Sequence, residues 1–257
     1  MDMFTTGIVL SGGAVRGIAH LGVLKALHEQ NTKIDVIAGT SIGAIIGAFY
    51  AQGYSPDEIF QFYKDKNPFK YLRPQFPDIG LLSADKLFAD FATYFNSSSF
   101  EELNIPLYVT TTNLTLGQQA VFSKGKLLPI LKAASSVPVI FKPEKIDDML
   151  HADGGLLSNF PVEPLIDKCK TLIGVNVNPI EEASELNNLN SIILRSIHLS
   201  IWGNTNKNID KVDIYIEPEK LKQYSLIDYS HMDDIYEAGL NSGREIIKKS
   251  NLLELSN

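Results

Sequence analysis

The chain opens with short apolar runs, each followed by apolar residues at helical spacing. Residues 7–10 form the first run, which ends in a glycine-containing loop, and a second run covers residues 34–38. The apolar positions that follow these runs are Ile18, Leu21, Leu24 and Leu27, then Ile42, Ile45, Ile46 and Phe49. Short apolar runs are typical of buried strands, and stripes of this spacing are typical of amphipathic helices. The pattern predicts a strand, a helix, a second strand and a second helix.

The rest of the chain continues this alternation. Ser55-Pro56-Asp57-Glu58 has the pattern of a capping box with proline at the first helical position, and Ser83 is expected to cap a helix that runs to about Phe95. Further strands are predicted at 107–112, 120–122, 172–177 and 212–216, and further helices at about 186–202 and after Ser230. Such alternation predicts a three-layer α/β/α sandwich around a mostly parallel sheet.

We expect a single domain over residues 1–257. The segments that carry the motifs described below span about 7–178, and residues 179–257 are expected to add helices and one strand. No repeat, low-complexity tract or clear linker interrupts the sequence.

Composition narrows the class of protein. The 257 residues are 44% hydrophobic and 21% charged, which is enough apolar material for one large core and excludes a disordered chain. The 23 basic residues are outnumbered by 30 acidic ones, a formal charge of −7, so we expect no nucleic-acid partner. The single cysteine, Cys169, and the lack of zinc-type Cys/His spacing predict a reducing compartment and no metal site.

Targeting and membrane-spanning segments are not expected. The N-terminus has no basic cluster and passes directly into an apolar strand, unlike a secretory signal, so we predict a cytoplasmic protein. Residues 36–56 carry no charge over roughly the ~20 residues of a membrane span. Glycines interrupt this stretch and its end is polar, which favours a strand, a turn and a helix.

The second glycine loop has the pattern of a nucleophile elbow. Gly39-Thr40-Ser41-Ile42-Gly43 matches G-x-S-x-G between the predicted strand and the predicted helix. Small flanking residues permit the sharp turn that exposes the serine, and the helix N-terminus favours a developing negative charge. The alternative is that Ser41 merely caps the helix. The context favours a nucleophilic serine.

The first glycine loop, Gly12-Gly13-Ala14-Val15-Arg16-Gly17, lies on the same edge of the predicted sheet as Ser41. It partly matches the dinucleotide fingerprint G-x-G-x-x-G, but Ala14 replaces the middle glycine, and Asp35 precedes the second strand instead of ending it. Beside a nucleophile, the backbone amides of such a loop are suited to hold an oxyanion. Two roles remain open for Arg16, which either fixes the loop or binds a substrate phosphate.

A nucleophilic serine needs a base, and the residues alone leave the choice open. In the usual order of serine, acid and histidine, the histidine is either His198 or His231, but both lie in helical patterns. Asp153 ends a predicted strand in the turn Asp153-Gly154-Gly155, which is able to face the same crevice; the alternative is an ordinary Asp-Gly turn. His20 and His151 are candidates to line the site, and packing is the alternative for both.

The two glycine loops and the Asp153 turn, in this order, resemble the motifs of the patatin-like phospholipase family. Further similar segments are Ala134-Ser135-Ser136-Val137-Pro138, Asn159-Phe160-Pro161-Val162 and Gly174-Val175-Asn176-Val177, so the resemblance extends from Ile8 to about Asn178. It implies that Ser41 is the nucleophile and Asp153 the base, in a Ser-Asp dyad without histidine. The implied oxyanion donors are the amides of Gly12, Gly13 and Ala14, supported by Arg16, Gly17, Gly39, Gly43, Gly154 and Gly155. Many members have glycine in place of Ala14 and alanine in place of Gly155.

The resemblance implies hydrolysis of fatty acyl esters of lipids through an acyl-serine intermediate, with no cofactor. The mechanism requires a partly dehydrated Asp153 with a raised pKa. The expected partner is a phospholipid or another fatty acyl ester, with transient contact to a membrane surface. Residues 66–82 mix aromatic, proline and basic residues without a period and are our candidate for a lid or membrane-contact loop. Two alternatives are an α/β-hydrolase-type esterase with a histidine base and a non-catalytic module that binds a lipid or nucleotide.

Overall fold

A computed structural model of the chain describes residues 3–66, 73–74, 82–83, 85–95, 98–138, 140–180, 182, 186–226 and 229–250. The strands are β1 (Phe4–Leu10), β2 (Val36–Thr40), β3 (Arg73–Pro74), β4 (Leu82–Ser83), β5 (Leu107–Asn113), β6 (Gln118–Phe122), β7 (Glu144–Ile146), β8 (Met149–Asp153), β9 (Cys169–Val175) and β10 (Ile214–Ile216). The α-helices are α1 (Ile18–Glu29), α2 (Ile42–Gln52), α3 (Pro56–Lys66), α4 (Asp85–Tyr94), α5 (Leu127–Ala134), α6 (Leu189–Asn206) and α7 (Met232–Lys249). The predicted alternation of strands and helices is confirmed.

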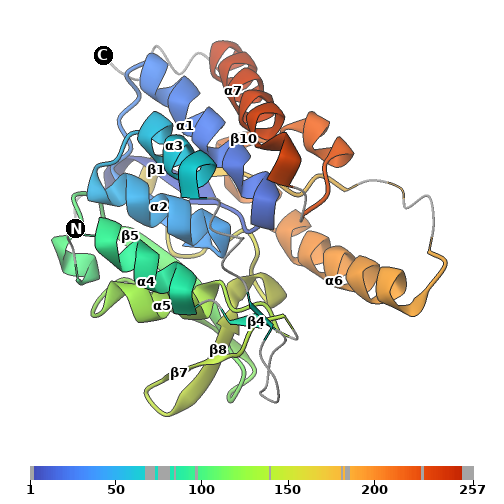
Figure 1. Cartoon of the computed structure of the whole chain (residues 1–257). Coiled ribbons are helices and arrows are strands. Elements are labelled where there is room, and N and C mark those ends of the chain that lie inside the picture. Colours follow the sequence, from blue (N-terminus) through green and yellow to red (C-terminus); the bar gives the residue numbers. More distant parts are fainter. Residues whose placement is uncertain are drawn as a thin grey trace.

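One mixed sheet forms the centre of the molecule (Figure 1). Its strand order is β10-β9-β1-β2-β5-β8-β7, with β6 also paired to β5. The first five strands of this order are parallel, and the pairs β5–β6, β5–β8 and β7–β8 are antiparallel. The expected mostly parallel sheet with helices around it is therefore confirmed. β3 and β4 form a separate two-stranded sheet.

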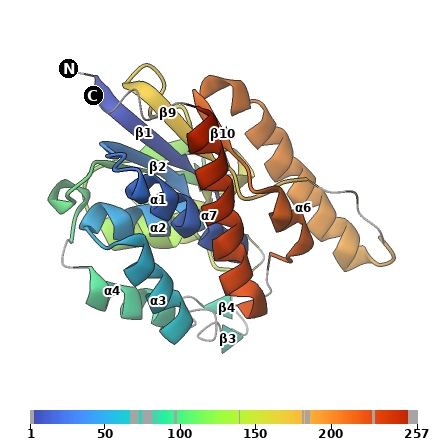
Figure 2. The same ribbon diagram turned by 90° about the horizontal axis from the view of Figure 1, so that it is seen from above.

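The central strands are buried on both faces, as their continuous apolar runs predict. Successive side chains of a strand point to opposite faces, so Ile8 and Leu10 join the larger core and Val9 joins a smaller one. The larger core packs under α1, α2 and α7, which lie together over one face of the sheet (Figures 1 and 2). The smaller core packs against Phe160 and Leu165, from the segment between β8 and β9.

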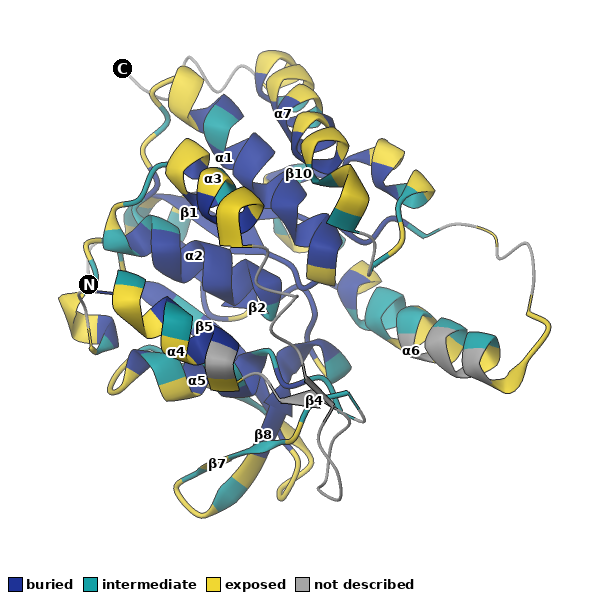
Figure 3. Ribbon diagram, viewed as in Figure 1, coloured by how far each residue is buried: buried dark blue, intermediate teal, exposed yellow. Residues whose placement is uncertain are grey.

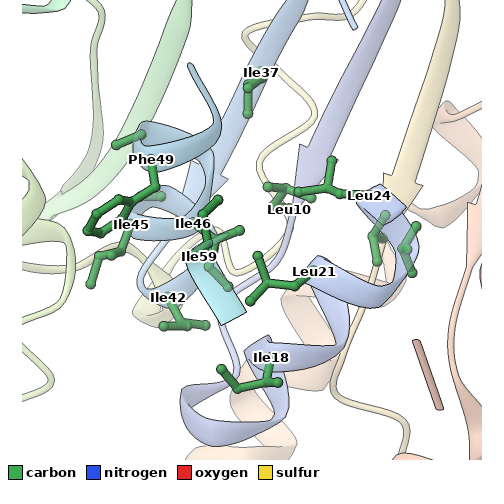
Figure 4. Close-up of a cluster of buried hydrophobic side chains, with 14 of the residues drawn as sticks. Leu10, Ile18, Leu21, Leu24, Ile37, Ile42, Ile45, Ile46, Phe49 and Ile59 are labelled. Carbon is green, nitrogen blue, oxygen red and sulfur yellow. The ribbon is translucent and has the colours of Figure 1, made fainter. Parts of the chain in front are cut away.

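The helix stripes seen in the sequence are the buried faces of α1 and α2 (Figure 3). Ile18, Leu21 and Leu24 from α1 approach the side chains of α2 and of the strand ends in one cluster (Figure 4). Helix α7 packs along α1, where Gly239 leaves no room for a side chain, since a Cβ there would lie 2.0 Å from the carbonyl oxygen of Ala19. The C-terminal part of the chain thus completes the core that positions the two glycine loops.

Several boundaries differ from the sequence expectations. Ser83 belongs to β4, and α4 begins at Asp85, so Ser83 is not the cap. Helix α6 begins at Leu189, later than expected, because Asn188 and Ser191 form a reciprocal capping box there. Most of the expected lid, residues 66–82, lies outside the described residues. Among the helices that the structure describes, none has the length and apolar content needed to span a bilayer, and residues 36–56 fold as strand, turn and helix.

Candidate active site

Strand β5 brings the two predicted catalytic loops together. One edge of β5 is paired with β6 over residues 109–113. The opposite edge is shared: β2 pairs with it up to Thr40 opposite Thr110, and β8 pairs with it from Asp153 opposite Thr111. Because β2 runs parallel to β5 and β8 runs antiparallel, their C-terminal ends meet head-on. Ser41 follows the end of β2 and Asp153 ends β8, so the elbow serine and the carboxylate come together.

The turn at Ser41 has the strained backbone of an elbow. Its φ of 54° and ψ of −128° lie where a side chain is rarely tolerated, at a cost of about 1–3 kcal/mol. Gly43 lets α2 approach the end of β1, because a Cβ there would lie 2.3 Å from the carbonyl oxygen of Leu10. A Cβ on Gly39 would lie 2.7 Å from the amide of Ala44. Both glycines of the motif are therefore required by close backbone contacts.

Asp153 is buried, with 5% of its surface exposed. Burial raises the pKa of its carboxyl to about 6, although the nearby Ser41 hydroxyl and the Gly155 amide lower it. Oδ1 accepts a hydrogen bond from the Gly155 amide at 2.7 Å. Oδ2 is buried without a hydrogen-bond partner among the described residues, and the Ser41 hydroxyl lies near enough to the carboxyl to lower its pKa. The raised pKa agrees with the expectation for a carboxylate that acts as a base.

The first glycine loop lies against Ser41. A Cβ built on Gly12 would lie 3.2 Å from Cβ of Ser41. The Gly12 amide donates a hydrogen bond to the carbonyl oxygen of Asn159 at 3.1 Å, however, so it is not available as the expected oxyanion donor. The amides of Gly13 and Ala14 have no hydrogen-bond acceptor within the described part of the chain. Ala14 has a φ of 47°, the left-handed conformation in which glycine is unstrained.

Arg16 lies under the loop and not on the surface. Only 3% of it is exposed, and its Nε donates to the backbone oxygen of Tyr224 at 2.7 Å. The amide of Val15 donates to the carbonyl of Leu226 at 3.2 Å. These bonds favour the first of the two open roles, in which Arg16 fixes the loop. Gly17 supports the same contact region, because a Cβ there would overlap the side chain of Ile42.

His20 anchors the residue before the glycine loop. Its Nε2 lies 2.9 Å from the carbonyl oxygen of Ser11, which can only accept, so Nε2 carries the proton. The ring is completely buried, and burial lowers its pKa to about 4 against the hydrogen bond to Ser11, which raises it. His20 is therefore a neutral packing histidine that holds the loop, the alternative weighed for it from the sequence.

Two asparagines that sequence reasoning did not assign connect the loops. Asn159 accepts from the Gly12 amide through its backbone oxygen, and a Cβ on Gly155 would lie 3.0 Å from its Oδ1. Asn204 of α6 accepts from the Asn159 amide at 2.8 Å and donates from Nδ2 to the carbonyl oxygen of Gly155 at 2.9 Å. In the sequence, Asn159 belongs to a segment that resembles the family, but the resemblance gave this residue no role. Nothing in the sequence predicts a role for Asn204 except that it is a polar residue inside a helix.

The two histidines of the alternative triad lie in the C-terminal part of the chain. His231 precedes α7, where it is exposed and pairs with Asp234 at 3.1 Å. His198 lies within α6. The described contacts of Ser41 lead to Asp153. His151 lies behind Asp153 on β8 and contacts Thr111 Oγ1 at 2.9 Å. Burial raises the pKa of Cys169 to about 11, which argues against a reactive thiol.

Comparison with known proteins assigns the chain to a family. The sequence model of the patatin-like phospholipases matches residues 8–166, which is more than half of the chain and includes Ser41 and Asp153. The chain belongs to the patatin-like phospholipase family. The family match ends well before α6 and α7, so the contacts that these helices make are features of this chain that the match does not cover.

Curated relatives include lysophospholipase NTE1 of Saccharomyces cerevisiae, 27% identical over 93% of this chain and 16% of that protein. An uncharacterized NTE family protein of Mycobacterium bovis is 32% identical over 62% of this chain and 44% of its own length. The chain thus spans only a minor part of these relatives. Among solved structures, VipD from Legionella pneumophila has the same fold, with a TM-score of 0.55 and 14% identity over 97% of this chain and 67% of that one.

Proposed function

We propose that the protein hydrolyses carboxylic esters of fatty acyl lipids, with phospholipids and lysophospholipids as the substrate class. Family membership and relatives named lysophospholipase support this substrate class. The observation that carries the proposal is the pairing of Ser41, strained at the tip of its turn, with a buried Asp153 whose pKa is raised to about 6. A carboxylate with this pKa is a better proton acceptor than an ordinary aspartate and is still ionised at neutral pH.

In the proposed reaction, Asp153 takes the proton of the Ser41 hydroxyl while Oγ attacks the acyl carbonyl carbon. The carbonyl oxygen becomes an oxyanion, for which the amides of Gly13 and Ala14 are the proposed donors. When the tetrahedral intermediate collapses, the ester bond breaks and the leaving alcohol receives the proton from Asp153. Water, deprotonated by Asp153, then attacks the acyl-serine. The bond between the acyl carbon and Oγ breaks, Oγ receives the proton back from Asp153, and the fatty acid is released.

The helix that follows Ser41 supports charge development at this point. Helix α2 begins at Ile42, so the N-terminal end of its dipole lies beside the nucleophile. Residues 12–17 also turn into a helix, with Ala14–Gly17 forming a 3₁₀ turn before α1. Ser41 thus lies at the N-terminal end of α2, and the proposed amide donors lie at the start of the turn that leads into α1.

The test is active-site labelling combined with product release. We expect a fluorophosphonate to add once to the wild-type protein by intact mass, with loss of fluoride, and not to Ser41→Ala. Fatty acid release from lysophosphatidylcholine should be lost in both Ser41→Ala and Asp153→Asn, whereas Ser98→Ala, which alters an exposed serine, should behave as wild type. Hydrolysis that persists in Ser41→Ala, or folded wild-type protein that neither labels nor hydrolyses, would overturn the proposal.

A further inference from the structure

Helix α6 carries an exposed apolar face. Leu189, Ile192 and Leu199 are 71%, 48% and 45% exposed. At 100° per residue these positions fall within about 80° of one another around the helix, together with the exposed Ser196. Gly203 continues this face at the C-terminal end, where an added Cβ would meet no atom within 4 Å. The face is therefore open along the length of the helix.

None of the described side chains of α6 belongs to the cores that bury α1, α2 and α7. Of its described side chains, only Thr205, near the C-terminal end, is buried. The N-terminal end of α6 lies farthest from the sheet (Figures 1 and 3). Helices α1 and α2 are in contrast buried almost throughout. Three large apolar side chains on one exposed helix face are typical of an interaction surface.

The charges of α6 and of the whole chain indicate which kind of partner this apolar face binds. Residues 186–206 contain no aspartate or glutamate in a chain of net charge −7, and Arg195 is their only lysine or arginine. An acidic protein is repelled by anionic surfaces over most of its area, whereas α6 carries no carboxylate that would oppose contact with a lipid headgroup layer. The apolar face then enters the boundary between headgroups and acyl chains.

The position of α6 relative to the catalytic loops connects this surface with the proposed reaction. Asn204, one residue after Gly203, hydrogen-bonds to Gly155 and Asn159, which adjoin Asp153 and Gly12. The exposed face therefore belongs to a helix whose C-terminal end contacts both catalytic loops. We propose that the face of α6 formed by Leu189, Ile192 and Leu199 docks on the lipid surface that holds the substrate. This inference rests on the proposed function.

The test compares two triple variants with matched exchanges. In one, Leu189, Ile192 and Leu199 become glutamate; in the control, Leu114, Leu116 and Val121, exposed to a similar degree on the β5–β6 hairpin, become glutamate. We expect the α6 variant to lose vesicle binding and hydrolysis of phosphatidylcholine vesicles at least tenfold. Its activity on a soluble p-nitrophenyl butyrate substrate should stay within twofold of wild type, and the control should match wild type in all three assays.

The outcomes separate this inference from the proposed function. Soluble-ester hydrolysis and fluorophosphonate labelling report the proposed function, and flotation with phosphatidylcholine vesicles reports the surface. Equal vesicle binding by the α6 variant and wild type, or equal loss on both substrates, would overturn the docking surface. A wild-type dimer that the α6 variant dissociates would assign the face to a second copy and would also overturn it.

We infer independently, from hydrogen bonds, that Asn204 is a positioning residue for Asp153. Its side chain holds the carbonyl of Gly155 and the amide of Asn159 at the same time. The Gly155 amide in turn donates to Asp153, and the Asn159 carbonyl accepts from Gly12. One side chain on α6 thus fixes the turn that carries the carboxylate relative to the glycine loop.

The test is Asn204→Ala on the soluble ester, with Asn206→Ala, an exposed asparagine of the same helix, as the control. Removing the clamp weakens the hydrogen bond that holds down the pKa of Asp153, so we expect the midpoint of the pH–activity profile to rise. kcat should fall at least tenfold with KM within twofold, while Asn206→Ala stays at wild-type values. A profile with an unchanged midpoint, or equal losses in the two variants at equal Tm, would overturn the positioning role.

Discussion

Gly155 donates its backbone amide to Oδ1 of Asp153, two residues earlier, at 2.7 Å. The bond favours the ionised carboxylate, but burial opposes it more strongly, and the pKa of Asp153 is about 6 instead of the ordinary 3.8. The same group therefore has two consequences that can be measured separately, one for catalysis and one for the free energy of unfolding.

Activity should depend on pH through the ionisation of Asp153. The proposed base works only when deprotonated, so kcat/KM on a soluble ester should fall about tenfold per pH unit below pH 6 and level off above pH 7. A pH–rate profile between pH 4.5 and 8, with Tm recorded at each pH to separate unfolding from ionisation, measures this. Activity that stays level down to pH 4.5 would mean that a group with an ordinary carboxyl pKa serves as the base.

Asp153→Asn should stabilise the fold at neutral pH. In the wild type the folded state holds its proton up to about pH 6, whereas the unfolded chain loses it near pH 3.8, so stability falls as pH rises between these values. The shift corresponds to at most about 3 kcal/mol above pH 6. Urea unfolding at pH 7.5 and at pH 4 should show the variant more stable at the higher pH and close to wild type at the lower one. An equal difference at both pH values would contradict this.

Ionisation of His20 should change the free energy of unfolding in the opposite direction to that of Asp153, over nearly the same pH range. Its pKa is lowered from 6.5 to about 4, so the unfolded chain binds a proton that the folded protein excludes, and stability falls as pH drops from 6.5 to 4. His20→Gln removes this ionisation and keeps a donor for the Ser11 carbonyl. Between pH 7 and pH 4.5 the stability of the variant relative to wild type should rise by about 2–3 kcal/mol in urea titrations. A pH-independent difference would show that His20 does not titrate as its burial implies.

Gly43→Ala should damage both stability and activity. The new Cβ would lie 2.3 Å from the Leu10 carbonyl and 2.5 Å from that of Ser11, so α2 or the end of β1 must move. We expect a loss of about 1–3 kcal/mol in chemical unfolding and a large fall in kcat, because Ser41 moves with α2. Gly203→Ala, in open space on α6, should instead gain up to about 1 kcal/mol from helix propensity.

The local motifs could be predicted from the sequence because they are set by nearest neighbours. The apolar runs placed the first two strands and helices, and the G-x-S-x-G pattern placed Ser41 at a strand-to-helix turn. The roles of individual amides could not be predicted in this way. The Gly12 amide is taken by the Asn159 carbonyl, a partner 147 residues away in the sequence, and no local pattern records that contact.

The contacts that the C-terminal part of the chain makes with the catalytic loops were the hardest to predict from the sequence. Helix α6 was expected as a helix, but its role as a clamp depends on Asn204 reaching two loops that the chain makes much earlier. The hydrogen bond through which Arg16 fixes the glycine loop likewise depends on the backbone oxygen of Tyr224. Such contacts arise from packing between distant segments, which hydrophobic period and turn chemistry do not encode.

The shared edge of β5 makes catalytic geometry a matter of strand register. A slip of β8 by one residue along β5 would move Asp153 by about 3.3 Å and turn its side chain to the other face of the sheet. The pairing of Asp153, Ala152 and His151 with residues 111–113 of β5 holds this register. A change that shifts β8 along β5 would therefore silence the site while leaving every residue of it unchanged.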